Sequence, residues 1–138
     1  MIRIVMGPPC GGKSTYVSEH AEKGDLIIDY DLIAKALGAP ISHAADGIIK
    51  QAAFDARESA ILRALSEPKE NAWIIHTSPT EEHIKRYEAV GAEFVELDPG
   101  RETCLERAKQ TSGLSRLMMA LKSIMLRRKE NQKCYTKP

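Results

Sequence analysis

The segment GPPCGGKST at residues 7–15 decides the fold, and it directly follows the apolar run IRIVM at residues 2–6. It matches the pattern G-x-x-x-x-G-K-[ST] without interruption and leads into a helix pattern that begins at Lys13. A strand, a glycine-rich turn and a helix in this order aim backbone N–H groups and the positive end of the helix dipole at one point. The sequence therefore predicts a phosphate-binding loop, or P-loop.

The residue types in this loop suit a polyphosphate and its metal ion. Lys13 is expected to reach the β- and γ-phosphates, and the Ser14 hydroxyl to ligate Mg²⁺. We predict that nine residues contact the nucleotide: Gly7, Pro8, Pro9, Cys10, Gly11, Gly12, Lys13, Ser14 and Thr15. The predicted ligands are Mg²⁺ and a nucleoside triphosphate, either ATP or GTP, because the sequence contains no motif that would read the base.

The composition is that of one globular domain. The chain has 138 residues, of which 43% are hydrophobic and 28% are charged, and this length is close to the commonest domain size. No run approaches the roughly 18 apolar residues of a membrane span, and the first residues lack a signal-peptide pattern. Cys10, Cys104 and Cys134 fit neither a disulfide framework nor a zinc site. We expect a cytoplasmic protein without a membrane partner.

Short apolar runs alternate with helix patterns along the chain. Strands are expected at residues 2–6, 25–29, 72–76 and 93–97, and helices at residues 13–21, 32–37, 44–65, 79–90, 100–110 and 114–129. Ser78 is expected to cap the fourth helix, with Pro79 in its first turn. The alternation predicts a single-domain α/β P-loop fold over residues 1–130, with a mainly parallel four-stranded sheet flanked by helices, and a tail at residues 131–138.

Two carboxylates follow the second predicted strand. Ligands of parallel sheets bind at the carboxyl ends of the strands, so Asp29 and Asp31 are candidates for chemistry. We expect Asp29 to lie near the metal ion together with Ser14, and Asp31 to accept the proton of an attacking hydroxyl, with Lys13 also in the catalytic group. A simpler role for Asp31 is to cap the helix that follows it.

The third predicted strand ends in His76-Thr77-Ser78, where a Walker B motif would place an aspartate. A neutral imidazole is a poor ligand for Mg²⁺, and we expect His76 to be a hydrogen-bonded residue at a strand end. The missing carboxylate favours an alternative to a kinase. In this alternative, the protein is a nucleotide-binding switch or accessory ATPase that acts through a protein or nucleic-acid partner.

Basic residues dominate the last third of the chain. Residues 1–100 carry a net charge of −6 and residues 101–138 a net charge of +7, which favours either a phosphate-rich partner or a solvated helix face. Arg107 and Arg116 are candidates to stabilise negative charge at a γ-phosphate from a lid hinged at residues 111–113. The helix at residues 44–65 is expected to wall the pocket of the attacking hydroxyl compound. Two roles stay open for Arg57 and Arg63 on this helix: contact with phosphate in that pocket, or the surface position that we expect.

Three segments together resemble a known family. GPPCGGKST, IIDYD at residues 27–31 and LDPGRETCLERAKQ at residues 97–110 look like the small P-loop kinases grouped with polynucleotide kinases and zeta-toxin-like phosphotransferases, and small phage-encoded P-loop proteins are similar. The resemblance implies that Asp31 is the base and that Arg107 lies on a lid helix. It implies an ATP-dependent kinase that transfers the γ-phosphoryl group to a hydroxyl of a nucleic-acid 5′ end or of a nucleoside.

Overall fold

A computed structural model of the chain describes residues 1–40 and 46–111. Four of the predictions lie wholly or mostly outside these residues: the lid hinge at 111–113, the helix at 114–129, the candidate Arg116 and the tail at 131–138. Within the described part, no helix is long and apolar enough to cross a bilayer.

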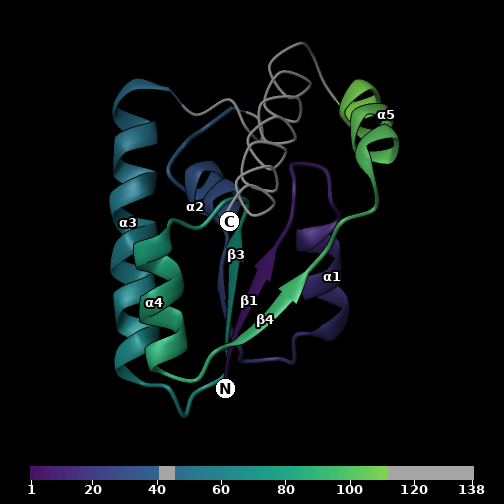
Figure 1. Cartoon of the computed structure of the whole chain (residues 1–138). Helices are drawn as coiled ribbons and strands as arrows, with labels where there is room; N and C mark the ends of the chain where they lie inside the picture. Colours follow the sequence, from purple (N-terminus) through teal and green to yellow (C-terminus); the bar gives the residue numbers. More distant parts are fainter. Residues whose placement is uncertain (41–45, 112–138) are drawn as a thin grey trace, which may run out of the picture.

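Four strands form one sheet in which every neighbouring pair is parallel (Figure 1). They are β1 (Ile2–Met6), β2 (Leu26–Ile28), β3 (Ala72–His76) and β4 (Glu93–Glu96), in the spatial order β2-β3-β1-β4. The sheet confirms the predicted α/β class. All four strands lie where the apolar runs predicted them, and the second and fourth are shorter than expected.

Helices cover both faces of the sheet (Figure 1). The described helices are α1 (Lys13–His20), α2 (Tyr30–Ala36), α3 (Gly47–Ser66), α4 (Glu81–Ala89) and α5 (Arg101–Thr111). Side chains alternate between the two faces along β1, as the pleat of a strand requires. Ile2 and Ile4 pack in one core cluster with Ile61 of α3 and Tyr87 of α4, while Val5 belongs to a second cluster with residues of α1 and β3.

The register of the strands brings their carboxyl ends to one level. Met6, the last residue of β1, pairs with His76 on β3 and with Glu96 on β4. The segments that leave these three strands therefore start side by side at the same edge of the sheet. This edge is where ligands of parallel sheets bind.

Two helix caps differ from the predictions. The helix α4 is capped by Thr80 instead of Ser78, because the Thr80 hydroxyl accepts a hydrogen bond from the backbone N–H of His83 and His83 Nδ1 accepts one from the Thr80 N–H. The helix α2 begins at Tyr30, and its cap is Asp29, whose Oδ1 accepts a hydrogen bond from the Asp31 N–H at 3.0 Å. The alternative in which Asp31 caps this helix therefore does not hold, because Asp29 occupies the cap position.

Candidate functional site

A cavity of about 1190 Å³ lies at the carboxyl ends of the strands. Its walls come from the glycine-rich loop and the start of α1 (residues 9–16), from the segment after β2 (29–31), from the end of β3 and the residues after it (75–78), and from the end of β4 onward (96–99). Thr80 and five helical residues complete the lining: Glu19, Phe54, Arg57, His83 and Arg107. The strand register thus gathers into one cavity most of the residues that the sequence singled out.

The glycine-rich loop needs its glycines at two positions. A Cβ atom at Gly7 would lie 2.3 Å from the backbone oxygen of Leu97, so any other residue at this position would clash with the backbone. Gly12 precedes α1 with a φ of 85°, in the left-handed region that favours glycine. Cys10 adopts a φ of 61° although it carries a side chain, so the loop holds one residue in a costly conformation.

Lys13 is held inside the loop at the start of α1. Its ammonium donates hydrogen bonds to the backbone oxygens of Gly7 at 2.9 Å and of Pro8 at 2.7 Å, and the residue is only 8% exposed. The glycine-rich loop therefore wraps around one lysine, which lies at the positive end of the α1 dipole. A buried positive charge beside a cavity favours an anionic ligand.

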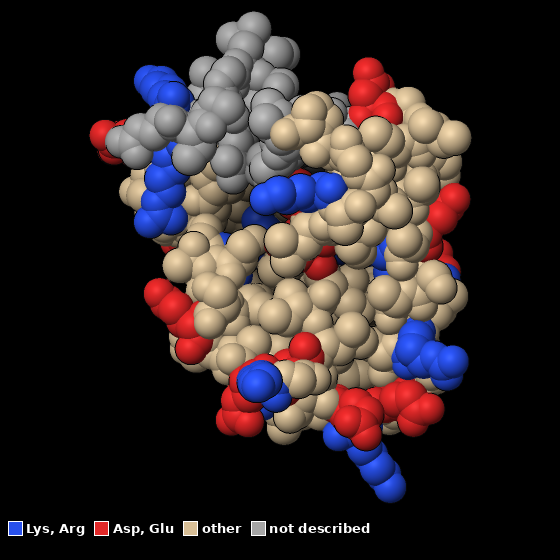
Figure 2. Space-filling model, turned by 180° about the vertical axis from the view of Figure 1, so that it is seen from behind, with Lys and Arg blue, Asp and Glu red and all other residues tan. Residues whose placement is uncertain are grey.

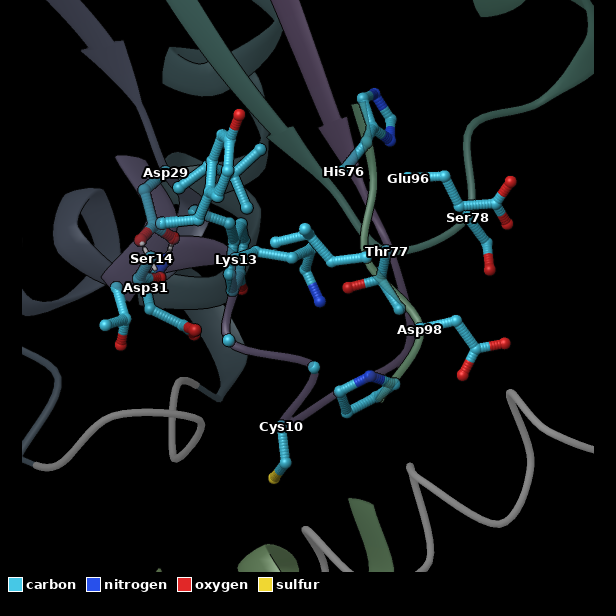
Figure 3. A pocket seen from close by; sticks show the side chains of 18 of the residues that line it. Cys10, Lys13, Ser14, Asp29, Asp31, His76, Thr77, Ser78, Glu96 and Asp98 are labelled. Atoms are coloured by element: carbon cyan, nitrogen blue, oxygen red, sulfur yellow. Dashed lines mark hydrogen bonds between the residues drawn. The ribbon is translucent and has the colours of Figure 1, made fainter. Parts of the chain in front are cut away.

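Ser14 and the two aspartates form a chain of contacts on one side of Lys13. The Ser14 hydroxyl donates a hydrogen bond to Asp29 Oδ2 at 3.0 Å, and the other oxygen of Asp29 accepts the Asp31 N–H. Figure 3 shows these three residues grouped on one side of Lys13, with Thr77, Ser78 and Asp98 on the other. Two oxygen-bearing groups, a hydroxyl and a carboxylate, are thus adjacent, and these are ligand types that Mg²⁺ accepts.

Arg107 of α5 contacts the glycine-rich loop. Its guanidinium donates a hydrogen bond to the backbone oxygen of Cys10 at 3.2 Å, and the same nitrogen lies 3.5 Å from the position that a Cβ of Gly12 would occupy. The two contacting residues are 97 positions apart in the chain. The structure therefore places Arg107 at the cavity, whereas Arg116 lies outside the described residues.

The far side of the cavity holds a cluster of aromatic and polar side chains. The rings of His76, His83 and Tyr87 lie with centroids 4.9–6.1 Å apart. His76 is 6% exposed, and burial, followed by electrostatic interactions with Arg57 and His83, lowers its pKa to about 3. Burial raises the pKa of Tyr87 to about 12. Both rings are therefore neutral at neutral pH.

The expected hydrogen bond of His76 is not found at Nε2. Among the described residues, neither this buried nitrogen nor the buried hydroxyl of Tyr87 has a hydrogen-bond partner. The neighbours of the ring include the rings of His83 and Tyr87, and an imidazole is either neutral or positively charged. His76 consequently supplies no negative charge where a Walker B aspartate would stand.

The prediction that Arg57 lies at the surface is wrong. Arg57 of α3 is 7% exposed and lines the cavity, and it donates a hydrogen bond to the Ile75 backbone oxygen at 3.2 Å. The signal was present in the sequence, since Arg57 lies four residues from both Ala53 and Ile61, which are fully buried. Residues with this spacing share one face of a helix.

The remaining charged and sulfur-containing groups add little to the site. Cys10 and Cys104 are free thiols, and burial, together with the negative charge of Asp98, raises the pKa of Cys104. No group of three histidine, cysteine or acidic residues within residues 1–40 and 46–111 has the arrangement of a metal site. On the face shown in Figure 2, blue and red side chains lie mostly around the margin, and one blue side chain crosses the upper middle with red atoms near it.

Comparison with known proteins identifies the fold. No family model and no curated protein matches the sequence. Among solved structures, the chain is similar to one chain of the Pnkp1/Rnl/Hen1 RNA repair complex, with a TM-score of 0.63 and 15% sequence identity. The match covers 94% of this chain and 45% of that one, so the protein spans less than half the length of its structural neighbour. The chain therefore shares its α/β fold with part of a component of an RNA repair complex.

Proposed function

We propose that the protein is an ATP-dependent P-loop kinase, a phosphotransferase that moves the γ-phosphoryl group to a hydroxyl acceptor. The acceptor in this proposal is a nucleic-acid 5′-hydroxyl or a nucleoside. The observation that carries the proposal is the buried ammonium of Lys13 inside the glycine-rich loop, at the start of a helix and at the wall of a cavity. Loop amides, helix dipole and ammonium together favour a polyphosphate.

In this proposal Ser14 and Asp29 hold Mg²⁺. The hydrogen bond between them supports the assignment, because Asp29 brings a carboxylate from β2 to the hydroxyl that follows Lys13. This carboxylate occupies the neighbourhood that a Walker B aspartate on β3 would serve. The metal ion would neutralise phosphate charge and orient the triphosphate.

Asp31 and Arg107 are the proposed partners for the transfer itself. Asp31 lines the cavity one position after the first residue of α2, and in this proposal it accepts the proton of the acceptor hydroxyl. Arg107 reaches the glycine-rich loop at Cys10 and would stabilise charge on the migrating group. We propose the same charge-stabilising role for Arg116.

The nucleic-acid acceptor is supported by the structural neighbour. A chain of an RNA repair complex shares the fold over nearly the whole of this protein. This likeness favours the proposal that the acceptor is the hydroxyl at a nucleic-acid end. A free nucleoside is the smaller acceptor that carries the same hydroxyl group.

A screen with γ-labelled ATP or GTP tests the proposed function. The full chain is incubated with Mg²⁺ and with oligonucleotides, nucleotides and nucleosides that carry free hydroxyl groups, and label transfer to each acceptor is measured. We expect a labelled acceptor in at least one class, and none with Lys13→Ala. A protein that binds the nucleotide yet labels no acceptor contradicts the kinase proposal.

His76 supports a second candidate, a nucleotide-dependent switch or accessory ATPase that acts through a partner. The end of β3 bears a neutral ring where hydrolytic P-loop proteins carry a carboxylate. Nucleotide-dependent binding of a protein or nucleic acid without label transfer would establish this alternative.

A further inference from the structure

Two thiols lie where the glycine-rich loop and α5 meet. Cys10 belongs to the loop, is half-buried and lines the cavity, whereas Cys104 of α5 is 0% exposed. Both are free cysteines, and the proposed phosphoryl transfer uses neither sulfur atom. Cys10 therefore brings a nucleophilic sulfur to the loop that is proposed to bind phosphate.

Arg107 shows which side of α5 faces the loop. Its guanidinium donates a hydrogen bond to the Cys10 backbone oxygen at 3.2 Å. Cys104 precedes Arg107 by three positions on α5, and residues with this spacing share one face of a helix. Because the Cys104 side chain is fully buried, it belongs to the packed side of α5. The Cys104 thiol therefore lies on the side of the helix that contacts Cys10.

The sulfur of Cys10 points toward α5. Figure 3 shows it directed away from Lys13 and Ser14, on the side of the loop where α5 lies. The electrostatics agree with this placement: burial, followed by interactions with Asp98 and with Cys10, raises the pKa of the Cys104 thiol. Such interactions weaken with distance, so the two thiols are neighbours.

We propose that Cys10 and Cys104 are a redox-sensitive modification site, in which a peroxide converts the two thiols into a disulfide between the glycine-rich loop and α5. The bond ties the loop to the helix and weakens the binding of ATP; this consequence, unlike the bond itself, rests on the proposed function. A disulfide holds its two Cα atoms within roughly 4.4–6.8 Å of each other. The tethered loop can then no longer adjust its amides to the phosphates.

Exposure decides the order of the two chemical steps. The peroxide reaches the half-buried Cys10 first and oxidises its thiol to a sulfenic acid, and one water molecule is released. The Cys104 sulfur then attacks the sulfenic sulfur: the S–S bond forms, the S–O bond breaks, and the hydroxide leaves with the Cys104 proton as a second water molecule. In total the two thiols lose two electrons and two protons, and the peroxide is reduced to water.

Disulfide mapping in the full chain tests the pairing without any nucleotide. The protein is treated with hydrogen peroxide, and peptide mass spectrometry under non-reducing conditions identifies the joined cysteines. We expect a bond between Cys10 and Cys104 within one chain, and the same bond in Cys134→Ala. A disulfide to Cys134 in its place, or the absence of a bond between Cys10 and Cys104 in folded, oxidised protein, overturns the inference.

Calorimetry with Mg²⁺ and ATP measures the consequence. We expect oxidation to weaken ATP binding by at least about 10-fold, the loss of a hydrogen bond to a charged group, and dithiothreitol to restore it. Restoration is the informative step, because dithiothreitol reduces a disulfide and leaves methionine sulfoxide unchanged. Cys134→Ala should respond as the wild type does. Cys104→Ala should lose little affinity on oxidation, because its loop stays untethered.

Thermal unfolding checks that Cys104→Ala folds. If it does not, the loss of ATP affinity in the wild type is compared with the mapped fraction of disulfide, and the two should rise together. Oxidised, disulfide-linked protein that binds ATP as tightly as reduced protein overturns the regulatory consequence, and so does an equal, reversible loss in folded Cys104→Ala. Failure of the proposed function looks different: reduced protein then binds no ATP, while a mapped bond between Cys10 and Cys104 still upholds the modification site.

Discussion

Ser14 and Asp29 are joined by a hydrogen bond of 3.0 Å between the hydroxyl and Oδ2, across 15 positions of sequence. Asp29 is 5% exposed and also caps α2 through its other oxygen. One buried carboxylate thus fixes the start of a helix and orients a hydroxyl beside the lysine of the glycine-rich loop. Its two roles can be separated experimentally, because asparagine caps helices as well as aspartate does but carries no charge.

Asp29→Asn should therefore weaken the binding of Mg²⁺ and leave the fold intact. We expect the Mg²⁺ concentration for half-maximal ATP binding or turnover to rise by about 10-fold, as a charged ligand is lost, with the free energy of unfolding changed by less than about 0.5 kcal/mol. A Mg²⁺ titration and a urea unfolding curve measure the two effects. Asp46→Asn, at the cap of α3, is the matched control. An unchanged Mg²⁺ requirement would remove Asp29 from the proposed metal site.

Lys13→Ala should weaken ATP binding by at least about 10-fold, since a hydrogen bond to a charged group contributes about 1.5–3 kcal/mol. The lysine is buried against Gly7 and Pro8, so no other side chain can replace it without rearrangement of the loop. Calorimetry with Mg²⁺ and ATP measures the effect. Lys23→Ala, an exposed lysine between α1 and β2, should bind as the wild type does. Equal affinities of the wild type, Lys13→Ala and Lys23→Ala for ATP would contradict the assignment of Lys13 as a phosphate-binding residue.

Asp31→Asn should separate binding from transfer. The amide cannot accept the acceptor proton, and loss of a general base lowers the rate by about 100-fold or more. Nucleotide affinity should stay within about 2-fold, because Lys13 and the loop amides are unchanged. Initial rates of label transfer and calorimetry give the two numbers, with Asp55→Asn on the exposed side of α3 as control. Turnover at the wild-type rate would exclude Asp31 as the base.

His76 should make the fold sensitive to acid. The unfolded chain takes up a proton at this ring below pH 6.5, whereas the folded chain does so only near pH 3. Stability contributed by the neutral ring is thus present above pH 6.5 and is lost as the pH falls toward 3. We expect this group alone to lower the free energy of unfolding by about 2 kcal/mol between pH 7 and pH 5.

Urea unfolding at pH 7, 6 and 5 measures the effect of His76. The variant His76→Gln should show a shallower dependence of stability on pH than the wild type, and His20→Gln, at an exposed position of α1, should not. A pH dependence that is identical in wild type and His76→Gln would show that another group dominates acid unfolding.

Gly7→Ala should destabilise the fold by about 1–3 kcal/mol, the usual cost of forcing atoms into a packed site. The new methyl group would meet the Leu97 backbone oxygen at 2.3 Å, and backbone cannot move aside as a flexible side chain can. Gly24→Ala is the control, since its φ of 101° is also unfavourable for alanine but the space around it is open. Thermal or urea unfolding compares them. A smaller loss for Gly7→Ala than for Gly24→Ala would contradict the packing explanation.

Local patterns in the sequence were sufficient to locate the secondary structure. Each strand is a short apolar run followed by a turn, and the described helices follow from the spacing of apolar residues and from turn and cap residues. The α/β class and the strand–loop–helix unit at Lys13 therefore depend on residues that are neighbours in the chain. The cap of α4 was misplaced because Ser78 and Thr80 both offer a hydroxyl, and only the position of His83 in the folded helix favours Thr80.

The sequence alone determined that a glycine-rich loop follows a buried strand and leads into a helix, because these features depend on residues adjacent in the chain. Only the tertiary structure decided what surrounds that loop. The sheet order β2-β3-β1-β4 places Asp29 beside Ser14, and the packing of α5 brings Arg107 to Cys10. The burial of Arg57 and the exposure of Phe54 likewise depend on how α3 packs against the sheet. This packing results from many weak contacts between segments that are distant in the sequence.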